Sequence, residues 1–87
     1  MSIVWEKNTE AKFTAMIAKV PVFMRDIARA KVLKKAEDIV TKDGRAEITE
    51  KDMVAAFFEA TPFGFHGPMK SDMTELGIDY KAYGHDQ

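Results

Sequence analysis

The stretch VPVFMRDIARAKVLKKAEDIVTKDG, residues 20–44, decides the fold. Pro21 ends one helix, because proline lacks a backbone N–H and disfavours helical conformation in the residue before it. The same proline suits the first position of a following helix. The pattern therefore predicts a long helix over residues 21–43, with Gly44 as its C-terminal stop.

The apolar residues of this long helix change sides halfway along it. On a helical wheel, those of the first half share one side and those of the second half cluster on roughly the opposite side. The two sets are Phe23, Ile27 and Ala30, and then Val32, Ala36, Ile39 and Val40. A helix with two such faces is packed by different neighbours at its two ends, so we expect it to be the central element.

Shorter helices are predicted on both sides of the long one. The first begins near Asn8 or Thr9, either of which can serve as an N-cap, and its buried stripe is Phe13, Met16, Ile17 and Val20. After an extended link anchored by Ile48, Thr49 caps a third helix that ends at Thr61-Pro62. The predicted fold class is all-α: short helix, long central helix, short helix.

Residues 61–87 have a different composition. The segment PFGFHGP, residues 62–68, holds two prolines and two glycines and predicts a loop. One short helical piece is expected over residues 72–76. We therefore divide the chain into a three-helix domain, 1–60, and an irregular, aromatic C-terminal tail, 61–87, that packs on this domain or on a partner.

The composition is that of an ordinary soluble domain. The 87 residues carry a net charge of −1, whereas a generic DNA-binding domain is basic. The charge is uneven, with +4 over residues 21–36 and −4 over residues 37–60. There is no cysteine and no apolar run near the roughly 18 residues of a membrane span. We expect a cytoplasmic protein without a signal peptide, which docks on another protein or forms a homodimer.

No catalytic constellation or metal site is predicted. Gly64 and Gly67 flank a histidine but do not form a phosphate-binding loop. His66 and His85 are nineteen residues apart, and no pair of carboxylates completes a ligand set. The sequence by itself predicts no enzyme activity for this chain.

Arg25 and Arg29 are the candidate site residues of the long helix. They lie one helical turn apart on the side of Val32 and Ala36, where like charges repel by a few tenths of a kcal/mol. Two interpretations stay open. The arginines are solvated or paired inside the chain, or they anchor a carboxylate or phosphate of a partner or ligand.

Several of these residues together resemble a known family. Trp5, Thr9-Glu10-Ala11, VPVFMR, Arg29, Gly44 and the EIT before the third helix resemble the C-terminal domain of the B subunit of light-independent protochlorophyllide reductase, which also occurs as small free-standing proteins. The resemblance covers residues 5–57 and carries over Trp5, Ala11, Pro21, Phe23, Arg25, Arg29, Gly44, Ile48 and Thr49. The family's aromatic-alanine pair in the long helix is missing, since this chain reads LKKAEDIV there.

The resemblance implies a small non-catalytic interaction domain, accessory to a nitrogenase-like tetrapyrrole reductase of chlorophyll biosynthesis. Trp5, Phe23, Arg25 and Arg29 would bind the partner or an anionic ligand. No cofactor would be bound by this chain alone, although a tetrapyrrole would lie nearby. The cluster-binding domains of the full subunit are absent from this sequence.

The order of helices also resembles a histone fold, in which a Lys-Asp-Gly-Arg-x-x-Ile-Thr link precedes the last helix in a similar way. The alternative function is therefore a histone-like dimer that binds nucleic acid weakly. A pI near 6.1 argues against a nucleosome-type role.

Overall fold

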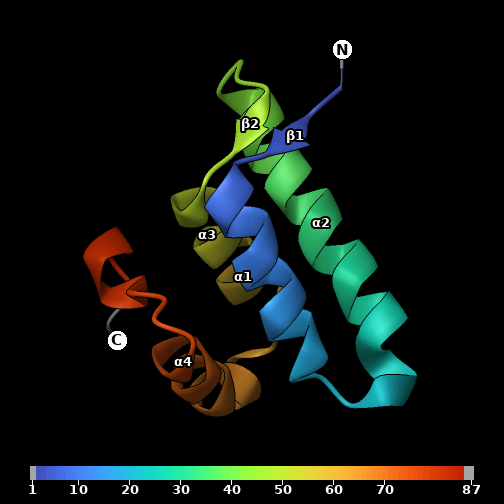
Figure 1. Cartoon of the computed structure of the whole chain (residues 1–87), viewed down its shortest axis with the longest axis vertical. Helices are drawn as coiled ribbons and strands as arrows, with labels where there is room; N and C mark the ends of the chain where they lie inside the picture. The colour runs from blue at the N-terminus through green and yellow to red at the C-terminus, as the bar shows by residue number, and fades with distance from the viewer. Residues whose placement is uncertain (1, 86–87) are drawn as a thin grey trace.

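A computed structural model describes residues 2–85 of the chain (Figure 1). Three helices follow one another as short, long and short: α1 (Lys7–Ala18), α2 (Arg25–Lys42) and α3 (Glu50–Ala60). The long helix α2 runs the length of the molecule, with α1 and α3 packed along it (Figure 1). The predicted all-α fold with a long central helix is confirmed.

Two short strands join the N-terminus to the link between α2 and α3. β1 (Val4–Trp5) pairs in parallel with β2 (Glu47–Ile48). The pairing is extended by hydrogen bonds from the Val4 N–H to the Ala46 carbonyl and from the Glu6 N–H to the Ile48 carbonyl, both 2.9 Å. Ile48 is buried, so the link is anchored where the sequence predicts.

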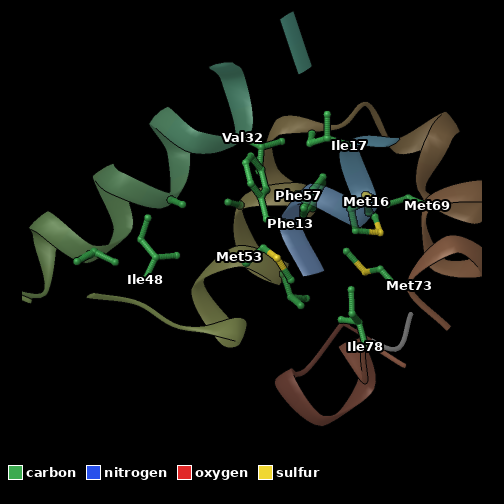
Figure 2. Packing of buried hydrophobic residues seen from close by; sticks show 14 residues of the cluster. Phe13, Met16, Ile17, Val32, Ile48, Met53, Phe57, Met69, Met73 and Ile78 are labelled. Carbon is green, nitrogen blue, oxygen red and sulfur yellow. The ribbon is translucent and has the colours of Figure 1, made fainter. Parts of the chain in front are cut away.

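The core lies between α1, the second half of α2, α3 and the C-terminal segment. Its buried apolar residues are Phe13, Met16, Ile17, Val32, Ala36, Val40, Ile48, Met53, Val54, Ala56, Phe57, Met69, Met73 and Ile78. Figure 2 shows side chains from all of these elements pointing into one cluster. Burial of this apolar surface is the main stabilising contribution to the fold.

Both ends of α2 differ in detail from the prediction. The helix begins at Arg25 rather than at residue 21, because Pro21 has an extended conformation and residues 22–24 form the 3-10 turn η1 (Val22–Met24). At the other end, Gly44 has φ +69° and the Arg45 N–H returns to the Val40 carbonyl at 3.0 Å. This left-handed stop is favoured at glycine, as the sequence predicts.

The first helix also begins earlier than expected. α1 starts at Lys7, after Glu6 in an extended conformation, so neither Asn8 nor Thr9 is its N-cap. Thr9 is buried, and its hydroxyl donates to Glu6 Oε1 at 2.7 Å. The pairing of β1 with β2 fixes the preceding residues as strand, which moves the helix start to Lys7.

The two faces of α2 have different outcomes. The second-half face is packed, since Val32, Ala36 and Val40 are buried. The face predicted for the first half is not packed: Phe23, which lies in η1, is 83% exposed, and Ile27 of α2 is 57% exposed. The expectation that neighbours within the chain pack both ends of this helix is therefore wrong for its first half.

The C-terminal segment is more regular than its composition predicts. It contains η2 (Phe63–Phe65), α4 (His66–Glu75) and η3 (Tyr80–Tyr83), where a loop and a helix over residues 72–76 are expected. Pro68 falls in the first turn of α4, where no helical N–H partner is needed, so it does not interrupt the helix. Met69, Met73 and Ile78 from this segment belong to the same core as Met16 of α1 (Figure 2).

Candidate functional site

One turn occurs twice in the chain, between α1 and α2 and between α3 and α4. In both copies a proline with φ near −55° and ψ near 142° (−52° and 140° for Pro21, −56° and 144° for Pro62) starts a 3-10 turn. The turn is closed by a 2.9 Å hydrogen bond to the proline carbonyl, from the Met24 N–H or from the Phe65 N–H. The next residue begins a helix and is basic: Arg25 in one copy, His66 in the other.

In the first copy, Arg25 satisfies the end of the preceding helix. Its Nε donates to the Val20 carbonyl and one terminal nitrogen donates to the Ala18 carbonyl, each at 2.8 Å. These carbonyls have no helical N–H partner, and the negative end of the helix dipole favours a cation there. The Arg25 side chain therefore already has hydrogen-bond acceptors within its own chain.

His66 has the same role in the second copy. Its Nε2 lies 3.1 Å from the Phe58 carbonyl and 2.9 Å from the Thr61 carbonyl. Carbonyl oxygens only accept hydrogen bonds, so Nε2 carries the proton and donates to both. The ring also packs edge-on against Phe58, with the centroids 5.0 Å apart.

Because the basic residue of each turn points back to the preceding helix, the apolar residues of the turn point into solvent. Six large apolar side chains on the two turns and the first turn of α2 are exposed: Val22, Phe23, Met24, Ile27, Phe63 and Phe65. The connection from α1 to α2 and the connection from α3 to α4 both lie in the lower part of the molecule in Figure 1, the first on the right and the second further to the left. We call these six side chains the apolar end.

The exposure at the apolar end is large. Phe23 is 83% exposed and Phe63 is 84% exposed. Single exposed apolar residues are ordinary, whereas several gathered at one end of a small domain mark an interaction surface. The apolar end is therefore the candidate functional site of the residues that the structure describes.

Of the four predicted site residues, only Phe23 belongs to this surface. Trp5 is half-buried and stacks on Phe13 with the ring centroids 4.5 Å apart. The Arg29 guanidinium lies over the ring of Phe13, 5.3 Å from its centroid. Arg25 binds the carbonyls described above. The structure thus gives Trp5, Arg25 and Arg29 partners inside the chain.

Phe63 and Phe65 are the site residues that sequence reasoning missed. They fall in a stretch of proline and glycine, for which a loop is expected without a role. The repeated spacing of a proline, three residues and a base, in PVFMR and PFGFH, is the signal that connects them to Phe23.

A basic segment, residues 21–36, leads away from the apolar end along α2. Five basic residues against the single acid Asp26 give this segment its charge of +4: Arg25, Arg29, Lys31, Lys34 and Lys35. Lys31 and Lys34 are exposed. The C-terminal acids of the two neighbouring helices are paired, Glu75 with Lys19 at 2.9 Å and Glu59 with Lys35 at 3.9 Å.

A bidentate ion pair at the opposite end of the molecule supports α3. Arg45 donates to both oxygens of Asp52, at 2.7 and 2.9 Å, and Asp52 also accepts from the N–H and the hydroxyl of Thr49, each at 2.9 Å. Burial raises the pKa of Asp52, but these hydrogen bonds outweigh burial and hold the pKa below its ordinary value. Thr49 precedes α3 as expected, and this cluster is structural.

Glu50, beside this cluster, holds the C-terminal segment. It accepts from the Tyr83 hydroxyl at 3.0 Å and is also paired with Lys12. Burial, together with this bond to Glu50, raises the pKa of the Tyr83 hydroxyl. Within residues 2–85 no three histidine or carboxylate side chains come together as metal ligands.

Two comparisons place the chain among known proteins. The family described as "Protein of unknown function (DUF2621)" matches residues 1–86. The chain is also 28% identical over 79 residues to the protein named "Membrane protein YneK" of Bacillus subtilis (strain 168), which covers 91% of this chain. It spans 56% of the length of that relative. No solved structure matches the chain.

These matches correct two expectations. The relative is named a membrane protein, which contradicts the cytoplasmic location expected from the sequence. Neither match connects the chain to chlorophyll biosynthesis or to a reductase, so those assignments are withdrawn. The resemblance to the reductase B-subunit domain stays a prediction. Of the helices that residues 2–85 form, none combines the length and the apolar character needed to cross a bilayer.

Proposed function

We propose that this chain, which belongs to the DUF2621 family, is a non-catalytic docking domain that works at a membrane. It binds its partner there through the apolar end. The observation that carries this proposal is the exposure of six large apolar side chains on two turns at one end of the molecule and on the adjoining first turn of α2 (Figure 1).

The physical support is the cost of leaving these side chains in water. Full burial of a phenylalanine or isoleucine side chain stabilises a complex by about 1.5–3 kcal/mol. Among the aromatic pairs of residues 2–85, none joins Phe23, Phe63 and Phe65 to one another, and Phe63 is paired with the ring of His66 at 5.4 Å between centroids. The fold therefore leaves this stabilisation to be gained on binding.

The proposed location at a membrane is based on the name of the Bacillus subtilis relative. That protein is named a membrane protein, and the present chain shares most of its own length with it. A domain of this family beside a membrane would have its apolar end in reach of lipid or of a membrane-embedded protein.

Fractionation of cells that express the full chain tests this function. We expect the wild-type chain in the membrane fraction and the variant Phe23→Ser with Phe63→Ser in the soluble fraction. Val4→Ser is the matched control, because Val4 is also exposed but lies in β1 at the other end of the molecule (Figure 1). Equal distribution of all three proteins would exclude the proposed function.

A second candidate is a homodimer in the histone-like arrangement, binding nucleic acid weakly. It is favoured by one observation, the exposure of Phe23 in η1 and of Ile27 in the first turn of α2. Sedimentation of the purified chain tests the dimer, and DNA binding that falls steeply with salt tests the nucleic-acid contact.

A further inference from the structure

We propose that the apolar end and the basic segment together bind the surface of an anionic lipid bilayer, with Phe23 and Phe63 inserted among the lipid chains. This inference rests on the proposed function and names its partner. The chain would lie on the membrane as a peripheral domain, with its other end in water.

The shape of the apolar end fits a bilayer surface. Its most exposed rings, Phe23 and Phe63, stand on separate turns, and both turns close the same end of the molecule (Figure 1). Surface-binding proteins bury apolar side chains about 5–10 Å into the boundary between headgroups and acyl chains.

The positive charge of the basic segment, next to the apolar end, favours anionic lipids. The basic segment carries +4, and its Lys31 and Lys34 are exposed. Each basic residue near an anionic membrane strengthens binding roughly fivefold, an effect that fades within a Debye length. Glu59 pairs with Lys35 of the basic segment itself at 3.9 Å, and Glu75 pairs with Lys19 outside it at 2.9 Å. The attraction is therefore assigned mainly to the exposed Lys31 and Lys34.

The same charge argues against a second copy of the chain as the partner. Two copies that met through their apolar ends would bring two segments of +4 together. Like charges across an interface oppose association. A surface of opposite charge gains from both the apolar contact and the electrostatic attraction.

Co-sedimentation of the purified full chain with protein-free vesicles tests the inference. We expect binding to vesicles that contain phosphatidylglycerol, at least about tenfold weaker binding to pure phosphatidylcholine, and weakening with salt. Phe23→Ser or Phe63→Ser should each lower the affinity by about tenfold or more, whereas Val4→Ser should not change it. Lys31→Glu should weaken binding more than Lys51→Glu, the same charge change on an exposed residue of α3.

Fluorescence gives a second readout that does not depend on loss of binding. Trp5 is the single tryptophan, and it lies in β1, away from the apolar end (Figure 1). We expect brominated lipids to quench the added emission of Phe63→Trp and to leave the emission of Trp5 in the wild type unchanged. Quenching of Trp5 alone would show that the opposite end faces the membrane and would overturn the inference.

Three other outcomes also overturn it. These are no binding to either vesicle, equal binding by the phenylalanine variants and the wild type, and a dimer in sedimentation that the same variants abolish. If the chain fractionates with cell membranes through its apolar end but does not bind protein-free vesicles, the partner is a membrane protein. The proposed function then stands and the lipid inference falls.

Discussion

Arg25 and His66 occupy the same position in two copies of one turn. Each stands four residues after a proline, begins a helix, and directs its side chain at carbonyl groups at and just beyond the end of the preceding helix. This arrangement explains how Arg25 and Arg29 coexist one helical turn apart. The first is stabilised by hydrogen bonds to the carbonyl end of α1 and the second lies over the ring of Phe13.

The same relationship produces the apolar end. Since the base of each turn is directed inward, the residues before it have no core to pack against and remain exposed. The same turn therefore has two effects. It ends α1 or α3, and it leaves phenylalanine side chains exposed to solvent.

Removal of the Arg25 side chain should destabilise the fold. Arg25→Ala leaves two carbonyls at the end of α1 without their donors, and we expect the free energy of unfolding to fall by about 1–2 kcal/mol. Arg29→Ala should cost less, below about 1 kcal/mol, because it removes a cation–π contact at an exposed position. Urea unfolding followed by circular dichroism measures both, and an equal loss would contradict the capping role of Arg25.

The two turns should accept each other's base. His66→Arg restores a donor to the Phe58 and Thr61 carbonyls, so we expect it to retain more stability than His66→Ala. The alanine variant should lose on the order of 1 kcal/mol. Thermal melts of the two variants decide the matter. If His66→Arg is less stable than His66→Ala, the two turns share a backbone conformation, but arginine cannot replace the side chain of His66.

Stability should depend on pH through Asp52. Its pKa in the folded chain lies below the ordinary value of 3.8, so between these two values the unfolded chain binds more protons. The contribution of Asp52 is present above pH 3.8 and is lost as the pH falls through the folded pKa. The free energy of unfolding can be measured from about pH 6 to about pH 2, roughly the range in which carboxylates titrate. It should fall less steeply with decreasing pH in Asp52→Asn than in the wild type.

Phe13 should be the most sensitive residue of the core. It is buried, stacks on Trp5 and lies 6.0 Å from the ring of Phe57. Phe13→Ala should cost about 3–5 kcal/mol, a large part of the stability of a small domain. Phe13→Leu serves as the milder variant, with a smaller loss expected. Denaturant midpoints at a common m-value provide the comparison.

The C-terminal segment should be needed for the fold of residues 1–60. Met73 is buried in the shared core, and its substitution by alanine should cost about 2–5 kcal/mol. A chain truncated after residue 62 should then lose its cooperative unfolding transition. Calorimetry of the truncated chain checks this, with Lys81→Ala, an exposed position of the same segment, as the control. A sharp transition in the truncated chain would show that residues 1–60 are an independent domain.

Local signals in the sequence account for much of the backbone. Pro21 and Pro62 mark the breaks between helices, Gly44 marks the end of α2, and Thr49 precedes α3. Apolar spacing also identifies most of the buried stripe of α1, because a helical period of 3.6 residues places Phe13, Met16 and Ile17 on one side. Val20, predicted as the fourth member, lies beyond the end of α1 and is only half-buried. These features depend on residues that are close in sequence, so they can be inferred without knowing the tertiary structure.

The site could not be inferred in the same way. Periodicity places Phe23 and Ile27 on an apolar face but does not show whether any segment covers that face. Composition also hides α4, because proline and glycine in its first turn have the pattern of a loop. Only the arrangement of the elements shows that the turn with Phe63 and Phe65 lies at the same end of the molecule as the turn with Phe23 (Figure 1).

The sequence by itself thus determined the all-α class, the long central helix and the places where helices stop. These follow from backbone sterics and from the period of apolar residues. Only the tertiary structure decided which basic side chains have partners within the chain and which apolar side chains remain exposed to water. Those properties depend on contacts between distant segments, such as Lys19 with Glu75 or Arg29 with Phe13, and no local pattern encodes such contacts.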